Sequence, residues 1–391
     1  MLAQRKRIAI IANNAGYTPD SAMGIYTWLL AVELSKRNFE IYYYCFGNYI
    51  DNSDSFENIK VFTIPRKIFW NKVVSSIKNE NVDTVLYHYL ATVWGWNGIP
   101  FLPPYYIFRL KLNGIKVISN FHETYIRWNF TKPWLLLQAI TQRIAAVIIL
   151  KSSRSAITSI DRYVRQLKKY NSIVDKIPIA TNILPPVSKD FGDNYRKELR
   201  EKLTPQNEVL IVSFGNRDYS ILIEKVSVLL RMNYKVKVVI IGYISNSHVK
   251  NCMNLIEKYG LKSNIILTGL VSQDEVYSYL AISDMIFSFE KVENGNEGGG
   301  SFKSGSLVAS FIANVPIITT SGDLNDDNFS REVPLFLFDP ADSESLLAIL
   351  KDLIDNPQKR TEYGLKTKSF YNSYLSWDRI TDRHVNIFQN C

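Results

Sequence analysis

The sequence predicts an α/β protein built from two doubly wound parallel sheets, each in a domain of its own. The chain has 391 residues, more than a single hydrophobic core usually holds. Strand-like segments alternate with helical segments twice along the chain, and these strands are apolar throughout rather than at every second position. Strands of that kind are covered by helices on both faces, and ligands bind beyond their carboxyl ends.

The expected strands are short apolar runs rich in β-branched residues. In the first half they are Arg7–Asn13, Phe39–Phe46, Lys60–Pro65, Thr84–Leu90, Lys116–His122, Ala145–Leu150 and Asp175–Ala180, with helices such as Ile25–Lys36 and Ile157–Lys169 between them. In the second half they are Val209–Gly215, Lys235–Gly242, Ile265–Leu270, Met285–Phe289, Pro316–Thr320 and Leu335–Phe338. The proline-containing segment Ile183–Val187 separates the two series, so we expect a first domain over residues 1–187.

Composition and cysteine usage indicate a soluble cytoplasmic protein. Hydrophobic residues make up 46% of the chain and charged residues 21%, as in globular proteins with full cores. The apolar run at the start, Ile8–Ala12, is too short for a signal sequence and suits a first buried strand. No uninterrupted run of 18 or more apolar residues appears, so no transmembrane helix is expected. The three cysteines are scattered, which fits a reducing compartment.

The charge is distributed unevenly between the two halves. Residues 1–187 carry 23 Lys and Arg against 11 Asp and Glu, a net charge of +12, and the remainder carries −3. A basic first domain favours an anionic partner such as nucleic acid, anionic lipid or a phosphorylated acceptor. The alternative is a solvated face of scattered lysines. No nucleic-acid-binding motif appears, so no nucleic acid partner is expected.

A glycine-rich loop in the second domain has the pattern of a phosphate-binding site. Gly298, Gly299 and Gly300 lead into Ser301-Phe302-Lys303-Ser304-Gly305-Ser306, which opens the helical segment Leu307–Ala313. Unpaired N–H groups at a helix start, a lysine and several hydroxyls together suit a phosphate or diphosphate. The alternative is an ordinary capped helix with Ser301 or Ser304 as its N-cap.

No metal or cofactor site is expected. The four histidines are not spaced as metal ligands with each other or with cysteine. The acidic segment Asp323–Asp327 suits a solvated turn better than an Asp-x-Asp metal motif, because it lies in a polar loop beyond a strand.

Four segments, in this order along the chain, are similar to one family. They are Asn13–Thr27 with Gly24, the strand Lys116–His122, the run Thr268–Phe287 and Ser376-Trp377. On these segments the chain resembles a GT-B glycosyltransferase, closest to glycosyltransferase family four, over nearly its whole length. The resemblance implies two Rossmann-like domains facing each other across a cleft. The first is the acceptor-side domain, residues 188–370 bind the nucleotide sugar, and the terminal helix within 371–391 crosses back to the first domain.

The resemblance also implies functional residues. His122 matches the family's active-site histidine, which would orient the donor sugar or the acceptor hydroxyl, and the alternative is a buried structural histidine. The residues expected at the nucleotide sugar are Gly24, Arg217, Gly242, Leu270, Glu297, Gly299, Gly300, Ser301, Lys303, Ser304, Gly305 and Ser306. Arg217, Lys303 and the helix amides would neutralise the charge that grows on the departing diphosphate, without a metal and with retention of configuration.

The chain departs from the family at the residues that usually hold the ribose. The family has two glutamates eight positions apart, and Ser301 and Ala309 occupy those places here. Only Glu290, Glu293 or Glu297 lies near enough to replace them, and the ribose ligand stays open.

The acceptor is indicated only by surface chemistry. The segment Tyr125–Trp134 mixes aromatic and cationic residues, which suits a membrane interface or a sugar-stacking surface, or else a loop that packs one helix onto the domain. With the positive charge, it favours a glycan or polyprenyl-diphosphate-linked acceptor in polysaccharide or cell-envelope synthesis. The enzyme would then be cytoplasmic, with peripheral contact to an anionic membrane at its inner face.

The expected reaction is therefore hexosyl transfer from a nucleotide sugar, with UDP-glucose as the default donor. Alternatives are a UDP-sugar epimerase of GT-B fold and a noncatalytic protein that binds sugar or nucleic acid.

Overall fold

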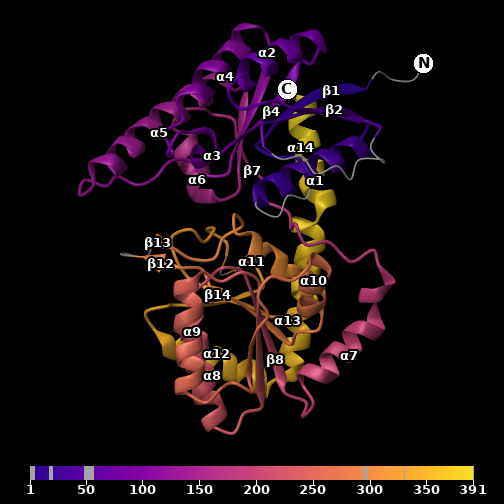
Figure 1. Ribbon diagram of the computed structural model, residues 1–391, viewed down its shortest axis with the longest axis vertical. Coiled ribbons are helices and arrows are strands. Elements are labelled where there is room, and N and C mark those ends of the chain that lie inside the picture. The colour runs from indigo at the N-terminus through magenta and orange to yellow at the C-terminus, as the bar shows by residue number, and fades with distance from the viewer. Residues whose placement is uncertain (1–4, 17–20, 48–56, 294–296, 330, 391) are drawn as a thin grey trace. The chain divides into compact units, whose positions relative to one another are not determined.

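The structure is a computed structural model that describes residues 5–16, 21–47, 57–293, 297–329 and 331–390, except for the side chains of Glu293 and Glu297. It divides into two compact units. Unit 1 contains Met1–Asn182 and Trp377–Cys391, and unit 2 contains Ile183–Ser376 (Figure 1). The sequence placed these divisions at residues 187 and 370.

Unit 1 is a seven-stranded parallel sheet with helices on both faces. The strand order is β3-β2-β1-β4-β5-β6-β7. Successive strands are added on one side of β1 up to β3 and on its other side from β4 onward, and β1 and β4 are parallel. Its elements are β1 (Lys6–Ile11), α1 (Ala22–Lys36), β2 (Phe39–Cys45), β3 (Ile59–Thr63), α2 (Phe69–Asn79), β4 (Thr84–Tyr89), α3 (Ala91–Trp94), α4 (Leu102–Leu112), β5 (Lys116–Phe121), α5 (Pro133–Ser152), β6 (Ser155–Thr158), α6 (Asp161–Leu167), β7 (Val174–Lys176) and α14 (Trp377–Asn390).

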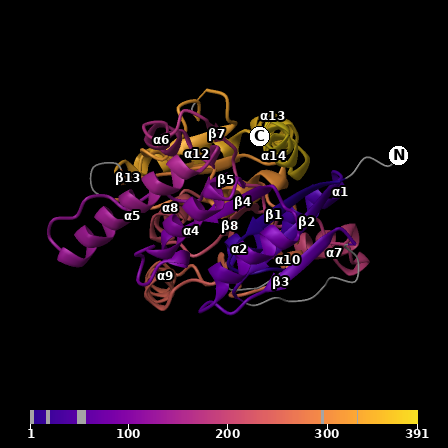
Figure 2. The ribbon, with the colours of Figure 1, turned by 90° about the horizontal axis from the view of Figure 1, so that it is seen from above.

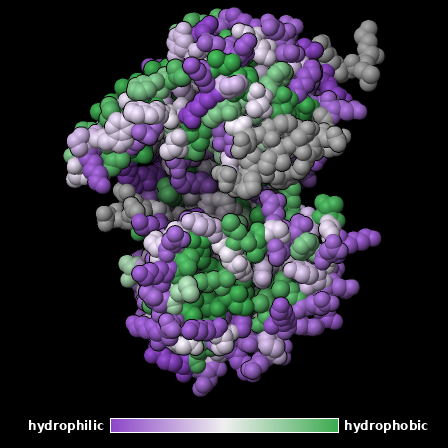
Figure 3. Space-filling model, viewed as in Figure 1, coloured by the Kyte–Doolittle hydropathy of each residue, from purple (hydrophilic) through white to green (hydrophobic). Residues whose placement is uncertain are grey.

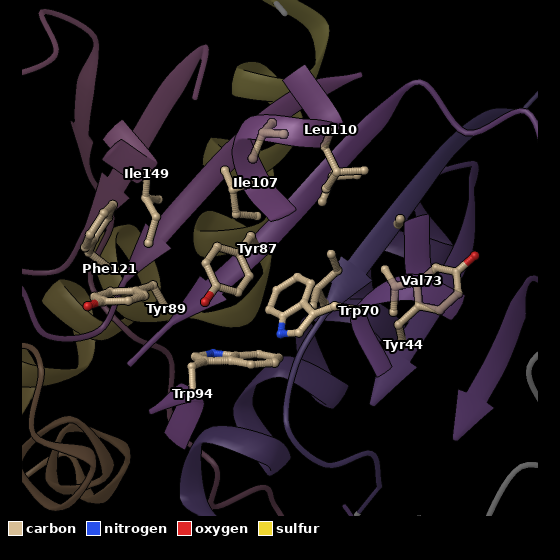
Figure 4. Close-up of a cluster of buried hydrophobic side chains, with 14 of the residues drawn as sticks. Tyr44, Trp70, Val73, Tyr87, Tyr89, Trp94, Ile107, Leu110, Phe121 and Ile149 are labelled. Carbon is tan, nitrogen blue, oxygen red and sulfur yellow. The ribbon is translucent and has the colours of Figure 1, made fainter. Parts of the chain in front are cut away.

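An aromatic core fills one face of this sheet, beneath α2, α4 and α5. Figure 4 shows Trp70 of α2, Trp94 of α3 and Tyr87 of β4 gathered at its centre. The Trp94 ring centroid lies 5.2 Å from that of Trp70 and 5.3 Å from that of Tyr87. Because Trp94 also donates a hydrogen bond from Nε1 to the His88 carbonyl at 2.7 Å, this core fixes the carboxyl end of β4.

The terminal helix α14 belongs to the opposite face of the same sheet, beside α1. Ile380 and Phe388 are fully buried there, and Arg37 at the end of α1 pairs with both Asp378 and Asp382. Trp377, the first residue of α14, donates from Nε1 to the Thr181 carbonyl at 2.9 Å. This helix therefore completes the core of unit 1.

Unit 2 is a six-stranded parallel sheet of order β10-β9-β8-β11-β14-β15. Successive strands are added on one side of β8 up to β10 and on its other side from β11 onward, so the strand order reverses between the parallel neighbours β8 and β11. Its elements are a 3-10 turn (Lys189–Phe191), α7 (Asp193–Leu203), β8 (Val209–Phe214), α8 (Ser220–Arg231), β9 (Val236–Ile241), α9 (Asn246–Lys258), β10 (Ile265–Leu267), α10 (Gln273–Ala281), β11 (Met285–Ser288), β12 (Val292–Glu293), β13 (Glu297–Gly298), α11 (Gly305–Ser310), a second 3-10 turn (Phe311–Ala313), β14 (Ile317–Thr320), β15 (Leu335–Phe338), α12 (Ser343–Asp355), α13 (Pro357–Phe370) and a π-helical turn (Tyr371–Leu375).

Both faces of the second sheet are also covered. One core contains side chains of α8, α9 and α12, and the other contains side chains of α7, α10 and the segment after α11. The two doubly wound parallel sheets confirm the predicted fold class.

One predicted strand is wrong. Ala145–Leu150 lies inside α5, and the strand that enters the sheet there is β6, Ser155–Thr158. The predicted helix Ile157–Lys169 shortens to α6, Asp161–Leu167, for the same reason. An apolar run alone does not separate a buried strand from a buried helix, and β-branched residues favoured the strand.

Candidate functional site

Two histidines meet at the carboxyl ends of neighbouring strands in unit 1. His122 directly follows β5, and His88 is the penultimate residue of β4. His88 Nδ1 lies 3.0 Å from His122 Nε2, with the ring planes inclined by 27°. One imidazole donates and the other accepts, so the orientation of His122 depends on His88.

Desolvation keeps both imidazoles neutral, although the side chain of His122 is partly exposed. His88 is fully buried, and desolvation lowers its pKa well below the usual range, with His122 and His384 adding smaller repulsion. Desolvation lowers the pKa of His122 to about 4. At neutral pH His122 therefore offers an uncharged ring that can orient a hydroxyl by hydrogen bonding.

Aromatic side chains hold this pair from two other elements. Tyr26 of α1 lies edge-on to His88 and His122, with ring centroids 6.2 and 5.9 Å away. Tyr26 also stacks on Trp377, the first residue of α14, at 5.6 Å. Sequence reasoning did not assign His88 or Tyr26 to the site. The sequence feature that could have indicated His88 is its position at the end of a predicted strand. That strand, β4, lies next to β5, and His88 is paired in register with Asn120, two residues before His122.

The predicted donor residue Gly24 lies in the first turn of α1. Its N–H donates to the hydroxyl of Ser21, the N-cap, at 3.0 Å. A Cβ at Gly24 would lie 2.9 Å from that oxygen and 3.0 Å from Asn14 Cβ. The glycine therefore lets the loop after β1 pack against the start of α1.

In unit 2, charged and hydroxyl groups converge where the strand order reverses. Arg217 follows β8 and Glu290 follows β11, and these two strands are neighbours. Arg217 Nη2 lies 3.0 Å from Glu290 Oε2, and Arg217 Nε donates to the Phe289 carbonyl at 3.1 Å. An open α/β sheet binds its ligand at this reversal point.

The start of α11 joins the same cluster. Ser304 is the N-cap of α11, and its hydroxyl donates to the Glu290 carboxylate. The Ser306 hydroxyl lies 3.5 Å from both Glu290 Oε1 and Arg217 Nη2. We call Arg217, Glu290, Ser304 and Ser306 the switch-point cluster.

The glycine triplet has a packing role. A Cβ at Gly299, whose φ is +93°, would lie 2.7 Å from the Gly322 backbone, and a Cβ at Gly300 would lie 2.6 Å from Thr319 Oγ1. Asp323 accepts the Gly298 N–H at 3.0 Å. These contacts seat the loop against the segment after β14, so the glycines are explained without a ligand.

The residues after the triplet differ in exposure. Ser301 and Phe302 are buried, and Phe302 packs on Phe329 at 4.8 Å and on Phe370 at 5.9 Å. Lys303 is partly buried, whereas a Cβ at Gly305 would meet no atom within 4 Å. The helix α11 is open to a ligand at Gly305, but its six residues give only a short helix dipole.

The remaining predicted donor residues lie at neighbouring strand ends. Gly242 follows β9, and its N–H donates to the Gly269 carbonyl at 3.0 Å. Leu270, beyond β10, is 80% exposed. The backbone of Glu297 belongs to β13, and its side chain lies outside the described residues. Ala309, at the position of the family glutamate, is buried in the core.

Metal ligands do not cluster in the described part of the chain. No group of three or more His, Cys, Asp or Glu side chains that could hold a metal ion occurs among those residues.

Comparison with known proteins agrees with this architecture. Residues 195–370, most of unit 2, match the family model described as glycosyl transferases group 1. Sucrose-phosphate synthase from Thermosynechococcus elongatus has a TM-score of 0.66 at 14% identity and covers 99% of both chains. Anabaena Alr3699/HepE in complex with UDP and glucose has a TM-score of 0.66 at 13% identity, covering 99% of this chain and 100% of its own. WaaG, a glycosyltransferase involved in lipopolysaccharide biosynthesis, has a TM-score of 0.63 at 12% identity, covering 97% of this chain and 99% of its own. A comparison with curated protein sequences gives no match.

The architecture is the two-domain GT-B fold of these solved structures. In the second unit, residues 195–370 are similar to group 1 glycosyl transferases, and the switch-point cluster lies within these matched residues.

Proposed function

We propose that this enzyme transfers a hexosyl group from a UDP-sugar, with UDP-glucose as the default donor, to a glycan or lipid-linked acceptor. The observation that carries the proposal is the switch-point cluster inside the region similar to group 1 glycosyl transferases. A solved structure of the same fold, HepE, contains UDP and glucose. No metal or cofactor takes part in the proposed reaction.

In the proposed reaction, side chains of unit 2 stabilise the leaving diphosphate. Arg217 is 30% exposed, so the diphosphate can reach its guanidinium while Glu290 and the Phe289 carbonyl hold it in place. Lys303 and the open backbone at Gly305 add a second charge and an N–H donor nearby in the chain. Charges held in position before the reaction stabilise the growing negative charge without reorganisation. Because α11 is short, the side chains carry more of this effect than the helix dipole.

His122 contributes orientation in the proposed reaction. Its Nε2 is occupied by His88, which leaves Nδ1 for a sugar or acceptor hydroxyl. A neutral ring of fixed direction can place a reacting hydroxyl, which lowers the entropic part of the barrier. We expect retention of the anomeric configuration, as in the family that the chain resembles.

The acceptor proposal depends on unit 1. Its basic charge and the segment Tyr125–Trp134 favour a glycan or polyprenyl-diphosphate-linked acceptor in polysaccharide or cell-envelope synthesis. We place the enzyme in the cytoplasm, in peripheral contact with the inner face of an anionic membrane.

A two-stage experiment tests the function. A thermal-shift screen over nucleotides and nucleotide sugars comes first, and UDP and a UDP-hexose are expected to raise the melting temperature, because a ligand that binds only the folded state stabilises it. Incubation of the stabilising donor with lipid-linked and soluble glycan acceptors follows, with NMR of the products. A new glycosidic bond supports transfer. An epimerised UDP-sugar with no transfer, or stabilisation by no nucleotide at all, overturns it.

A further inference from the structure

Helix α5 has an exposed face that is as apolar as its buried face. The buried side includes Ala139, together with Ala146 and Ile149, which belong to the aromatic core of the sheet. The opposite side exposes Leu137, Ile140, Ile144 and Ile148 by 43, 38, 55 and 39%. These positions recur every three or four residues, so they form one continuous stripe. A helix on the surface of a soluble domain normally has a polar stripe there.

The neighbouring helix α4 repeats this pattern. Ile107 and Leu110 face the core, whereas Leu102, Tyr105, Phe108 and Leu112 are exposed by 56, 55, 45 and 69%. We define the α4–α5 face as the exposed apolar side chains of these two helices, which pack against each other. Hydrophobic side chains coloured green in Figure 3 lie along the side of unit 1 where Figure 1 places α4 and α5.

Aromatic side chains extend this face at the start of α5. Trp134 is 41% exposed and meets Trp96, which is 70% exposed, with ring centroids 6.0 Å apart. In the preceding loop Phe130, 78% exposed, stacks on Trp128. This end of α5 projects beyond the rest of unit 1 in both ribbon views (Figure 1, Figure 2). Amphipathic aromatic rings are the residues that favour the boundary between lipid and water.

The stretch of chain that carries this face is almost entirely positive in charge. Between residues 84 and 154 the chain has eight Lys and Arg residues and one acidic residue, Glu123. Lys132 precedes α5, and Lys151 lies in its last turn. Lys111 of α4 donates to the Lys151 carbonyl at 2.8 Å, which places cations at the shared end of the two helices. This arrangement complements an anionic surface.

We propose that the α4–α5 face docks on an anionic lipid membrane, with the axis of α5 lying along the interface. Helix α5 is long and apolar enough to cross a membrane by length and composition alone, but its other side belongs to the core of unit 1, so it lies on the bilayer. A symmetric dimer through this face would bring two like-charged surfaces together. This inference names the membrane partner of the proposed acceptor function, and its test does not depend on catalysis.

The test is co-sedimentation of the full chain with vesicles of phosphatidylcholine alone and with about 30 mol% phosphatidylglycerol. We expect binding to the anionic vesicles only. Binding should fade between about 50 and 500 mM salt, as the Debye length contracts from roughly 14 to 4 Å. A variant with Leu137→Ser, Ile144→Ser and Ile148→Ser should bind at least about a hundredfold more weakly, since each loses apolar area that the interface would bury.

A matched variant controls for the loss of exposed apolar side chains in general. Met232, Met253 and Leu365 of unit 2 are 45, 58 and 65% exposed, and their replacement by Ser should leave vesicle binding unchanged. Thermal melting followed by circular dichroism shows that both variants fold. Equal binding to neutral and anionic vesicles, binding to neither, or equal losses in the two variants overturns the proposal. A dimer in solution that only the α5 variant dissociates, without vesicle binding, also overturns it. The vesicle assay uses no substrate, so its result does not depend on whether the enzyme transfers sugar.

Discussion

The contact between His88 and His122 makes a measurable prediction about catalysis. His88→Leu removes the hydrogen bond between His88 Nδ1 and His122 Nε2, which are 3.0 Å apart, at similar side-chain volume. A hydrogen bond of this kind contributes about 1 kcal/mol, and an imidazole that has lost its fixed direction must be reoriented in each turnover. We therefore expect kcat to fall about tenfold, with little change in KM for the UDP-sugar.

Two variants at or near this position separate positioning from folding. His88→Asn places an amide near the Nδ1 position and should restore most of the activity, because it can still bond to His122. Tyr87→Phe, next to it in β4, removes a buried hydroxyl that has no partner among the described residues. That change should leave kcat and stability near those of the wild type.

A double-mutant cycle tests whether His88 acts on catalysis through His122. His122→Ala should nearly abolish transfer while UDP affinity stays near wild type, since the proposed nucleotide contacts are in unit 2. In the His122→Ala background, His88→Leu should not lower kcat further, because His88 acts through His122. If His88→Leu lowers kcat equally with and without His122, or if His88→Asn restores nothing, the positioning role is refuted.

Three further predictions concern unit 2 and the dependence of stability on pH. Lys303→Ala should lower turnover by one to two orders of magnitude, about 1.4–2.7 kcal/mol, and weaken UDP binding less; wild-type turnover would contradict the role of this lysine at the diphosphate. Glu290→Gln should tighten UDP binding several-fold in calorimetry, because it removes a negative charge 3.0 Å from Arg217; weaker binding would show instead that Glu290 serves the nucleotide. Burial lowers the pKa of His384 to about 4 from 6.5. Between these values His384 binds a proton in the unfolded chain but not in the folded chain. Its contribution to stability is therefore fully present above pH 6.5 and falls by up to about 1.4 kcal/mol per pH unit as the pH decreases, in addition to the losses from His88 and His122. Denaturant unfolding from pH 7.5 to 4.5 measures this slope, which His384→Phe should reduce; an unchanged slope would assign the effect to other groups.

Much of the fold was predictable because each sheet strand is a separate apolar run. The runs at Phe39–Phe46 and Leu335–Phe338, for example, became β2 and β15 with at most one residue of change. The prediction failed at Ala145–Leu150, inside a helix that is apolar on both its buried and its exposed side. Such a helix has no polar stripe to reveal its period. The feature that misled the strand prediction is thus the one that suggests a membrane-facing surface.

The candidate site was predictable only at the level of single strand ends. His122 follows β5, and its position could be anticipated from the apolar run before it. Its partner His88 lies 34 residues earlier, and only the pairing of β4 with β5 brings the two rings together. Likewise, Arg217 and Glu290 are 73 residues apart and meet because β8 and β11 are neighbours. Pairs of this kind depend on strand order, which local sequence does not contain.

The glycine loop shows why a motif and its cause must be separated. From the sequence, three consecutive glycines indicated a backbone shaped for phosphate. In the structure Gly299 and Gly300 are required by close contact with Gly322 and Thr319. The open position is Gly305, at the start of α11, beside the hydroxyls that contact Glu290. Packing of the triplet therefore positions the start of α11 and its hydroxyls beside Arg217. The proposed contacts to the diphosphate remain Arg217, Lys303 and the backbone at Gly305.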